Sequence, residues 1–208
     1  MGMDLYNYLL KKYGYNEPIF TQEIAYKEYS KPWLYKELNR LCDEGALIRY
    51  DKGVYYIPKQ TALGPSLLDP RKVIRKKYVQ AGDTAVGYYS GNTLLNLLEL
   101  STQMPNSIEI FTNNEKSKVR EIRIGNQSVV LRRARTPVTN ENAAVLQFLE
   151  LMNFTDAAFY NRDRRAIVDR FIKEKGITRD KVTAYAPVFP DRVMRNLIES
   201  EVVYSVAP

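Results

Sequence analysis

The polar side chains best suited to ligand recognition lie on one side of a helix predicted over residues 32–45. Leucines recur in this segment at a spacing that places them on a single face, which must turn toward a core. The opposite face carries Lys36, Asn39 and Arg40. Lys, Asn and Arg side chains reach base edges and phosphates in the major groove of DNA. The pattern therefore predicts a DNA-reading helix, against the simpler alternative of a solvated helix face.

Further candidate contacts flank this helix. Residues at its N-terminus suit a phosphate, because free backbone N–H groups point outward there. Trp33 is either a packing residue or a nucleic-acid contact, and basic side chains of a following hairpin can reach the DNA backbone. The complete predicted DNA-binding set is Ser30, Lys31, Trp33, Lys36, Asn39, Arg40, Arg49 and Lys52.

A second group of basic side chains falls on two neighbouring predicted strands and just beyond them. The group consists of Arg120, Arg123, Arg132, Arg133 and Arg135. Acidic residues are few nearby, so the group predicts a binding surface for an acidic partner. A solvated strand face is the alternative.

Enzymatic chemistry has little to draw on in this chain. There is no histidine among its 208 residues, which removes Ser-His-Asp and Cys-His activation and histidine-based zinc sites. Phosphate-binding glycine motifs are absent, and Asp83 and Glu109 are isolated acids. Carboxylate chemistry with magnesium remains possible on composition, but the absence of these motifs fits a protein with no catalytic residue and no metal site.

The charge balance favours a polyanionic partner. Lys and Arg number 31 against 24 Asp and Glu, a formal net charge of +7. Most of the excess lies in residues 61–140, where basic side chains outnumber acidic ones two to one, whereas the first sixty residues are nearly neutral. Nucleic acid and acidic protein surfaces are the partners such a balance suits.

Cysteine usage and hydropathy indicate the compartment. Cys42 is the single cysteine and cannot form an internal disulfide, which favours a reducing cytoplasm. No apolar run is long enough for a membrane span, and the N-terminus lacks the basic-then-apolar order of a signal peptide. We therefore expect a cytoplasmic protein with no membrane partner.

The first sixty residues predict three helices and a hairpin. A helix is expected over 5–14, capped by Asp4 and ended by Gly14. A second is expected over 21–29, opened by Thr21, and a third over 32–45, with Ser30 as its N-cap and Gly45 as its stop. Two strand-like runs then flank a short turn within residues 46–58. Three helices followed by a hairpin are typical of a winged helix-turn-helix.

A boundary is predicted at residues 59–70, where Pro and Gly gather before a new helix. This gives a winged helix-turn-helix domain over 1–60 and a second domain over 61–208. Helices are expected in the second domain at 71–82, 91–100, 141–154 (capped by Thr139), 164–176 and 191–200. Strands are expected at 107–113, 119–125 and 127–133, the last two joined at Gly125-Asn126 as a hairpin. The predicted class is α+β, with a small, mostly antiparallel sheet flanked by helices.

Two segments resemble the AbiEi family, the antitoxins of bacterial type IV toxin–antitoxin systems. The first is SKPWLYKELNRLCDEGALIRYDKGVYYIP, with a Leu-x-x-Leu helix leading into a hairpin that bears Gly53, Val54 and Tyr55. The second is GYYSGNTLLNLLELSTQMPNSIEIFTN, which contains the run Thr102-Gln103-Met104-Pro105. The likeness spans most of residues 18–152, and it is the pairing of the two segments that is specific.

The resemblance implies a non-enzymatic antitoxin with two roles in phage defence by abortive infection. Its winged helix would bind operator DNA and act as a transcriptional repressor of its own operon. Its C-terminal domain would counteract a cognate nucleotidyltransferase toxin, either by direct contact or functionally. The resemblance implies no cofactor in this chain.

Two alternatives stay open at this point. The chain can be a winged-helix transcriptional regulator whose C-terminal domain senses a ligand or dimerises. It can also be a metal-dependent nuclease built from scattered acids such as Asp83 and Glu109.

Overall fold

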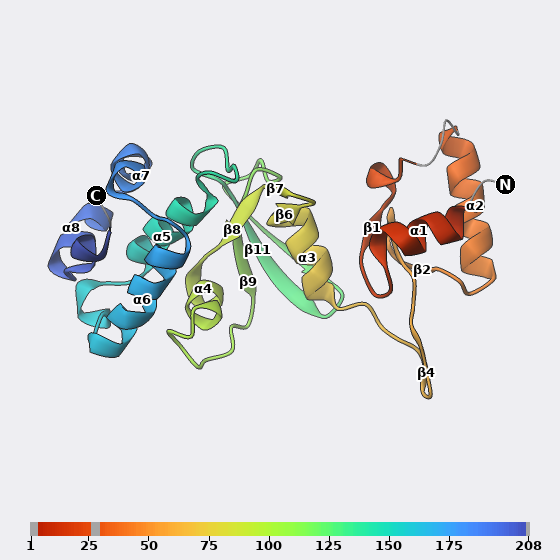
Figure 1. Ribbon diagram of the computed structural model, residues 1–208, viewed down its shortest axis with the longest axis horizontal. Coiled ribbons are helices and arrows are strands. Elements are labelled where there is room, and N and C mark those ends of the chain that lie inside the picture. Colours follow the sequence, from red (N-terminus) through yellow and green to blue (C-terminus); the bar gives the residue numbers. More distant parts are fainter. Residues whose placement is uncertain (1–3, 26–29, 207–208) are drawn as a thin grey trace. The chain divides into compact units, whose positions relative to one another are not determined.

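The computed structural model describes residues 4–25 and 30–206 and has a mixed α+β architecture, as the sequence predicts. The chain divides into two compact units, Met1–Val73 and Ile74–Pro208. Figure 1 shows the helices and strands of each unit. The division falls within helix α3 (Pro70–Tyr78). The boundary predicted after residue 60 stays a prediction about which parts of the chain fold independently.

The first unit combines helices with a small sheet. Its elements are α1 (Leu5–Tyr13), β1 (Ile19–Phe20), the 3-10 helix η1 (Thr21–Glu23), α2 (Lys31–Asp43), β2 (Ile48–Asp51), β3 (Val54–Tyr56), β4 (Gln60–Thr61) and β5 (Gly64–Pro65). Asp4 caps α1 by accepting a hydrogen bond from the Asn7 N–H at 2.8 Å. Gly14 ends the helix at a φ of 78°. The capping residues in the sequence thus predicted both ends of α1 correctly.

Helix α2 closes the small core of this unit with its apolar face. Leu38 and Leu41 are 0% and 3% exposed, and they belong to the same core cluster as Leu5 and Leu9 of α1. Burying each leucine contributes roughly 1.5–3 kcal/mol. The predicted division of this helix into an apolar and a polar face is confirmed.

A three-stranded sheet in the order β1-β3-β2 completes the first unit. Strands β2 and β3 form the predicted hairpin, with Ile48 opposite Tyr56. Strand β1 adds to the other side of β3, with Ile19 opposite Tyr55. No sequence pattern predicts β1, because a two-residue strand is too short to show a period.

The helix expected over residues 21–29 is wrong in its described part. Only the single 3-10 turn η1 forms there, and residues 26–29 lie outside the described residues. Side chains of α1 occupy backbone carbonyls that a longer helix would use: the Tyr8 hydroxyl donates to the Ala25 carbonyl at 2.6 Å, and Lys12 Nζ donates to the Glu23 carbonyl at 3.1 Å. Tertiary hydrogen bonds therefore override the local helix signal.

The second unit is built on a four-stranded sheet. The strands of this unit are β6 (Gln80–Ala81), β7 (Thr84–Ala85), β8 (Gly87–Tyr89), β9 (Ile108–Thr112), β10 (Val119–Ile124) and β11 (Gln127–Arg133). The sheet order is β10-β11-β9-β8, and β6 and β7 form a separate small hairpin. The β10–β11 hairpin turns at Gly125-Asn126, as predicted. The β11–β9 pair is parallel and the other two pairs are antiparallel.

Helices of the second unit gather around α5. They are α4 (Gly91–Leu97), α5 (Ala143–Phe154), η2 (Ala157–Phe159), α6 (Arg162–Glu174), α7 (Arg179–Tyr185), η3 (Ala186–Val188), α8 (Arg192–Glu199) and η4 (Val202–Ser205). Figure 1 shows α5 between the sheet and the C-terminal helices, and its residues from Val145 to Asn153 are almost all buried. The short helix α7 was not predicted.

Helix α5 begins at Ala143, later than the sequence predicted. The Asn142 side chain accepts a hydrogen bond from the Thr139 N–H at 2.7 Å and donates to the Pro137 carbonyl at 2.9 Å. These bonds close a turn over residues 137–142. Asn142, rather than Thr139, is therefore the residue that precedes the helix.

Gly87 lies where three backbone segments meet, and we expect Gly87→Ala to destabilise the protein by about 2 kcal/mol or more. A Cβ at this position would lie 2.1 Å from the Tyr78 carbonyl oxygen and 2.5 Å from that of Phe111. Backbone carbonyls cannot rotate away as a side chain can, so strand β8 would have to shift. Chemical denaturation measures the change. The control is Ser128→Ala, at an exposed position of β11, which should leave stability nearly unchanged.

No helix in the described part of the chain is long and apolar enough to cross a membrane.

Candidate nucleic-acid interface

The polar face of α2 carries the central residues of the predicted DNA-binding set. Lys36, Asn39 and Arg40 are all exposed, and they lie opposite the buried Leu38 and Leu41. The amphipathic pattern thus places all three on one accessible helix face. Their binding role stays a prediction.

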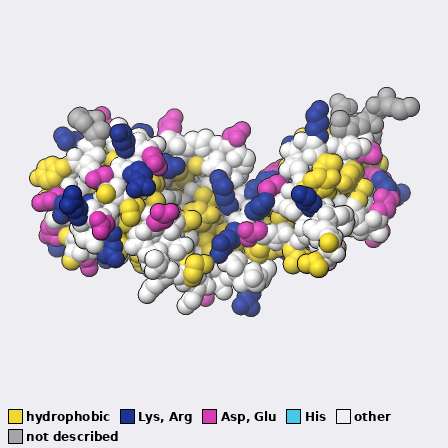
Figure 2. All heavy atoms as spheres, turned by 60° about the horizontal axis from the view of Figure 1, so that its bottom comes forward, with side chains coloured by type: hydrophobic (Ala, Val, Ile, Leu, Met, Phe, Trp, Pro, Cys, Tyr) yellow, Lys and Arg dark blue, Asp and Glu magenta, His cyan; other side chains and the backbone are white. Residues whose placement is uncertain are grey.

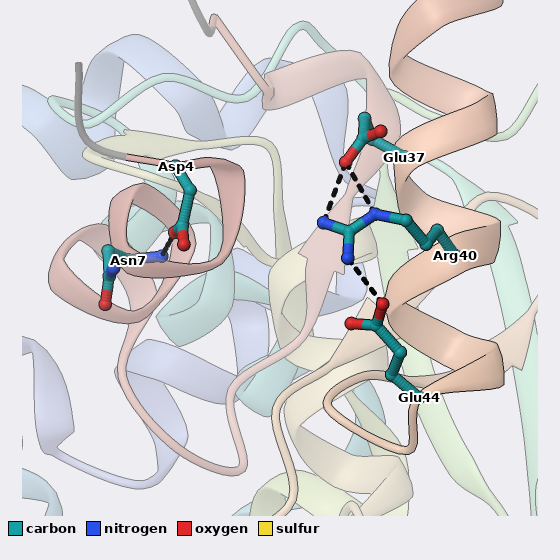
Figure 3. A network of polar contacts seen from close by, with 5 residues as sticks. All are labelled: Asp4, Asn7, Glu37, Arg40 and Glu44. Atoms are coloured by element: carbon teal, nitrogen blue, oxygen red, sulfur yellow. Dashed lines mark hydrogen bonds and ion pairs between the residues drawn. The ribbon is translucent and has the colours of Figure 1, made fainter. Parts of the chain in front are cut away.

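Arg40 differs from its neighbours because two carboxylates hold it. Figure 3 shows its guanidinium between Glu37 and Glu44 on the same helix. The Nε and Nη2 atoms lie 3.0 and 2.9 Å from Glu37 Oε2, and Nη1 lies 2.5 Å from Glu44 Oε1. Hydrogen bonds from Arg40 to Glu37 and then Glu44 raise the pKa of the guanidinium. The spacing of three and four residues was a readable signal for these pairs.

Pairing with two acids changes what Arg40 offers to DNA. The Glu37–Arg40–Glu44 group carries one positive and two negative charges, so its net charge opposes a phosphate. A base contact by Arg40 must first break hydrogen bonds to one carboxylate. Lys36 and Asn39 have no such partner among the described residues.

The flanking residues have different surroundings. Ser30 precedes α2 in an extended conformation, but its hydroxyl makes no capping hydrogen bond. Ser30 and Lys31 are exposed, which leaves this helix end open to an anion. Trp33 is partly buried and packs against the core of the first unit, which favours the packing role over a nucleic-acid contact.

Hairpin β2–β3 exposes its two basic residues. Arg49 lies on β2 and Lys52 lies at the turn. The Lys52 N–H donates to the Asp51 carboxylate at 2.7 Å, and Asp51 pairs with Val54 across this turn. The acidic side chain next to Lys52 lowers the positive charge available at the tip.

The predicted arginine group is divided between two faces of the sheet in the second unit. Cross-strand partners share a face, and neighbours along a strand alternate. Arg120 lies opposite Leu131, so it shares a face with Arg133, two residues further along β11. Arg132 is next to Arg133 on β11, and Arg123 is three residues from Arg120 on β10. Both therefore lie on the other face. The five arginines therefore do not form one flat surface.

Arg135 is anchored in the protein rather than free. Its Nε donates to Glu150 Oε2 at 3.2 Å, and the Glu150 side chain is only 5% exposed. The guanidinium carbon lies 5.5 Å from the ring centre of Phe111 and 4.9 Å from that of Phe189. Asn153 Nδ2 donates to the other carboxylate oxygen of Glu150 at 2.8 Å. Arg135 thus neutralises a buried charge and packs between aromatic rings.

Tyr88 adds a buried phenol to this region. Its ring stacks on Phe111 at 5.5 Å, and its hydroxyl has no hydrogen-bond partner among the described residues. Burial raises the pKa of Tyr88 far above its usual range, with the Glu150 charge as a second cause. The hydroxyl is therefore protonated at physiological pH.

Charges elsewhere in the second unit are mixed. In Figure 2 the helical part of this unit, on the left, shows Lys and Arg side chains interspersed with Asp and Glu. Residues 141–208 indeed contain equal numbers of basic and acidic side chains. This surface therefore offers no continuous positive patch on the side drawn.

The isolated acids do not assemble into a metal site. Across residues 4–25 and 30–206, no three His, Cys, Asp or Glu side chains are grouped as metal ligands. Glu109 Oε2 lies 3.8 Å from an Nη2 of Arg132, and Asp83 is exposed. Cys42 is partly buried, and burial raises the pKa of its thiol.

The chain is thus an α+β protein of two compact units, with an exposed polar helix face in the first unit. A family model matches residues 19–152 and is described as a family of unknown function, DUF6088. The chain belongs to this family, because the match covers more than half of its length. A comparison with curated proteins found no match.

Proposed function

We propose that the chain is a DNA-binding antitoxin without enzymatic activity. In this proposal its first unit is a winged helix-turn-helix that binds operator DNA and represses its own operon. Its second unit counteracts a cognate nucleotidyltransferase toxin. The sequence likeness to AbiEi antitoxins in residues 30–58 and 87–113 is the source of the antitoxin role.

The observation that carries the DNA-binding role is the exposed Lys36–Asn39 face of α2 directly before a hairpin with exposed basic residues. A recognition helix followed by a wing has this order. The β1-β3-β2 sheet supports the proposal, because β1 joins the hairpin to the chain before α2. Between α1 and α2 the described residues form the 3-10 turn η1 in place of the expected helix.

Electrostatics indicate that the first unit does not bind DNA alone. The α2 face gains little from Arg40, whose charge Glu37 and Glu44 balance. The excess of basic residues lies in residues 61–140 and includes exposed Arg71 and Arg75 of α3. We infer that this middle segment shares the contacts to DNA phosphates.

The salt dependence of DNA affinity tests whether the middle segment, residues 61–140, shares the phosphate contacts. Each phosphate contact steepens the slope of log affinity against log salt by roughly 0.9. We expect the full chain to bind a duplex from its own promoter, and Arg71→Gln with Arg75→Gln to flatten the slope by up to about 2. Fluorescence anisotropy at several chloride concentrations measures both slopes. Lys173→Gln with Lys175→Gln removes the same charge near the end of α6 and should leave the slope unchanged; an equal flattening would contradict the assignment.

The antitoxin role has a separate test. The chain is produced in cells together with the product of the adjacent gene, and growth is measured. Growth that is inhibited by the neighbour alone and restored by the chain supports the proposal. A neighbour that is harmless by itself, or inhibition that the chain does not relieve, contradicts it.

A further inference from the structure

A hollow of about 470 Å³ lies beside the end of strand β11 in the second unit. Four cationic side chains line it, together with three apolar ones: Lys118, Arg132, Arg133, Arg135, Phe111, Ala134 and Val188. Among the residues that the structure describes, no acidic one lines the hollow. We call this feature the basic pocket.

The geometry of β11 explains why consecutive arginines meet here. Within the sheet, Arg132 and Arg133 lie on opposite faces. Strand β11 ends at Arg133, and the chain continues through Ala134 to Arg135, which Glu150 and two aromatic rings hold in place. The pocket therefore forms at the end of β11, where the chain leaves the sheet and arginines from both sides of the strand line the same hollow.

The positive charge of the basic pocket is only half balanced. Glu109 lies 3.8 Å from Arg132, and Glu150 lies 3.2 Å from Arg135. Neither carboxylate lines the pocket, so each holds its arginine from outside it. Lys118 and Arg133 have no acidic partner within ion-pair distance among the residues that the structure describes. Two positive charges are thus left for a ligand.

The loop that carries Lys118 is held by hydrogen bonds rather than loose. The buried Glu115 carboxylate accepts from the Lys116 and Ser117 N–H groups, each at 2.9 Å. The bond from Ser117, and with it that from Lys116, lowers the pKa of Glu115. Asn113, at the start of this loop, exchanges two hydrogen bonds with the Val138 backbone at 2.8 and 2.9 Å. Little ordering is therefore needed when a ligand enters.

We propose that the basic pocket binds the phosphate of a small molecule of about nucleotide size. Arginine forks bind phosphate oxygens in pairs, and two unbalanced cations match a doubly charged phosphate. The volume lies in the range of small-molecule sites, roughly 300–1,000 Å³. Phe111 and Val188 add apolar surface for the non-phosphate part of the ligand.

A concave site favours a small ligand over the DNA backbone, although both offer phosphate. All residues of the pocket belong to the second unit, so the proposal does not depend on operator binding by α2. The basic pocket also suits a small ligand better than the surface of a protein toxin, because its charges face a group that enters the hollow. The experiment distinguishes these sources of phosphate.

Calorimetric titration of the full chain in chloride buffer tests the proposal with two probes, AMP and sodium pyrophosphate. We expect at least one to bind, and Lys118→Gln with Arg133→Gln to weaken that binding at least about tenfold, because charge-assisted hydrogen bonds are lost. Both substituted side chains are exposed, so the fold should be kept, which circular dichroism checks. Arg123→Gln with Lys175→Gln is the control. It removes one arginine and one lysine that lie outside the pocket and should change binding less than twofold.

Three results would overturn the proposal. The first is that neither probe binds to the unaltered chain. The second is equal weakening in the pocket variant and the control, which would mean attraction by net charge alone. The third is loss of duplex DNA binding in the pocket variant while neither small probe binds, which would assign the pocket to the DNA backbone. Tighter binding of AMP than of pyrophosphate would support contact with Phe111 and Val188.

Discussion

Replacing Arg135 with alanine is expected to lower the free energy of unfolding by about 3–5 kcal/mol, the largest effect of any substitution proposed for this protein. The change removes the cation that neutralises Glu150, whose side chain is 5% exposed. It also removes the planar group between Phe111 and Phe189. Asn153 would remain as a hydrogen-bond donor to the carboxylate, but it carries no charge. Denaturant unfolding followed by circular dichroism measures the loss.

Arg133→Ala is the matched control for this prediction. Arg133 is two residues away and exposed, and it has no ion pair among the described residues. We expect a change within about 0.5 kcal/mol. Adding Glu150→Gln to Arg135→Ala should restore part of the stability, because the buried charge is then gone. Equal losses for Arg135→Ala and Arg133→Ala would show that the Glu150 pair does not matter for folding.

The Lys36→Ala and Asn39→Ala variants are each expected to weaken operator binding by about 1–3 kcal/mol, or roughly tenfold to a hundredfold, if they contact base edges. This prediction rests on the proposed function. Both side chains are exposed and lie away from the core of the first unit, so stability should be almost unchanged. Anisotropy titrations with promoter duplex and with a scrambled duplex measure affinity and specificity separately.

Arg40 supplies the internal comparison for α2. Because its guanidinium is already bonded to Glu37 and Glu44, we expect Arg40→Ala to cost less operator affinity than Lys36→Ala. Glu44→Gln should tighten binding, since it removes a negative charge and frees part of Arg40. Operator binding that is unaffected by Lys36→Ala and Asn39→Ala would place the DNA contact on another face.

Local patterns predicted much of the secondary structure. The Leu38 and Leu41 spacing defined both faces of α2, and Gly125-Asn126 marked the turn between β10 and β11. These features depend on residues close together in the chain, where periodicity and turn preferences act. The expected helix over 21–29 failed in its described part for the opposite reason. Side chains of α1 donate hydrogen bonds to the Glu23 and Ala25 carbonyls of this segment, and no local pattern encodes such a contact.

The features of the candidate sites also divide into those that the sequence determines and those that the tertiary structure decides. The sequence determined which side chains α2 exposes, the basic excess of residues 61–140 and the absence of histidine chemistry. Only the tertiary structure decided that the four arginines on β10 and β11 separate onto two sheet faces and that Arg135 pairs with Glu150 on α5. It also decided that Lys118 joins three arginines around one hollow. Composition is a property of the chain as a whole, and hydrophobic periodicity depends on residues close together in it. A pocket and a buried ion pair depend instead on strand order and helix packing between segments distant in the chain.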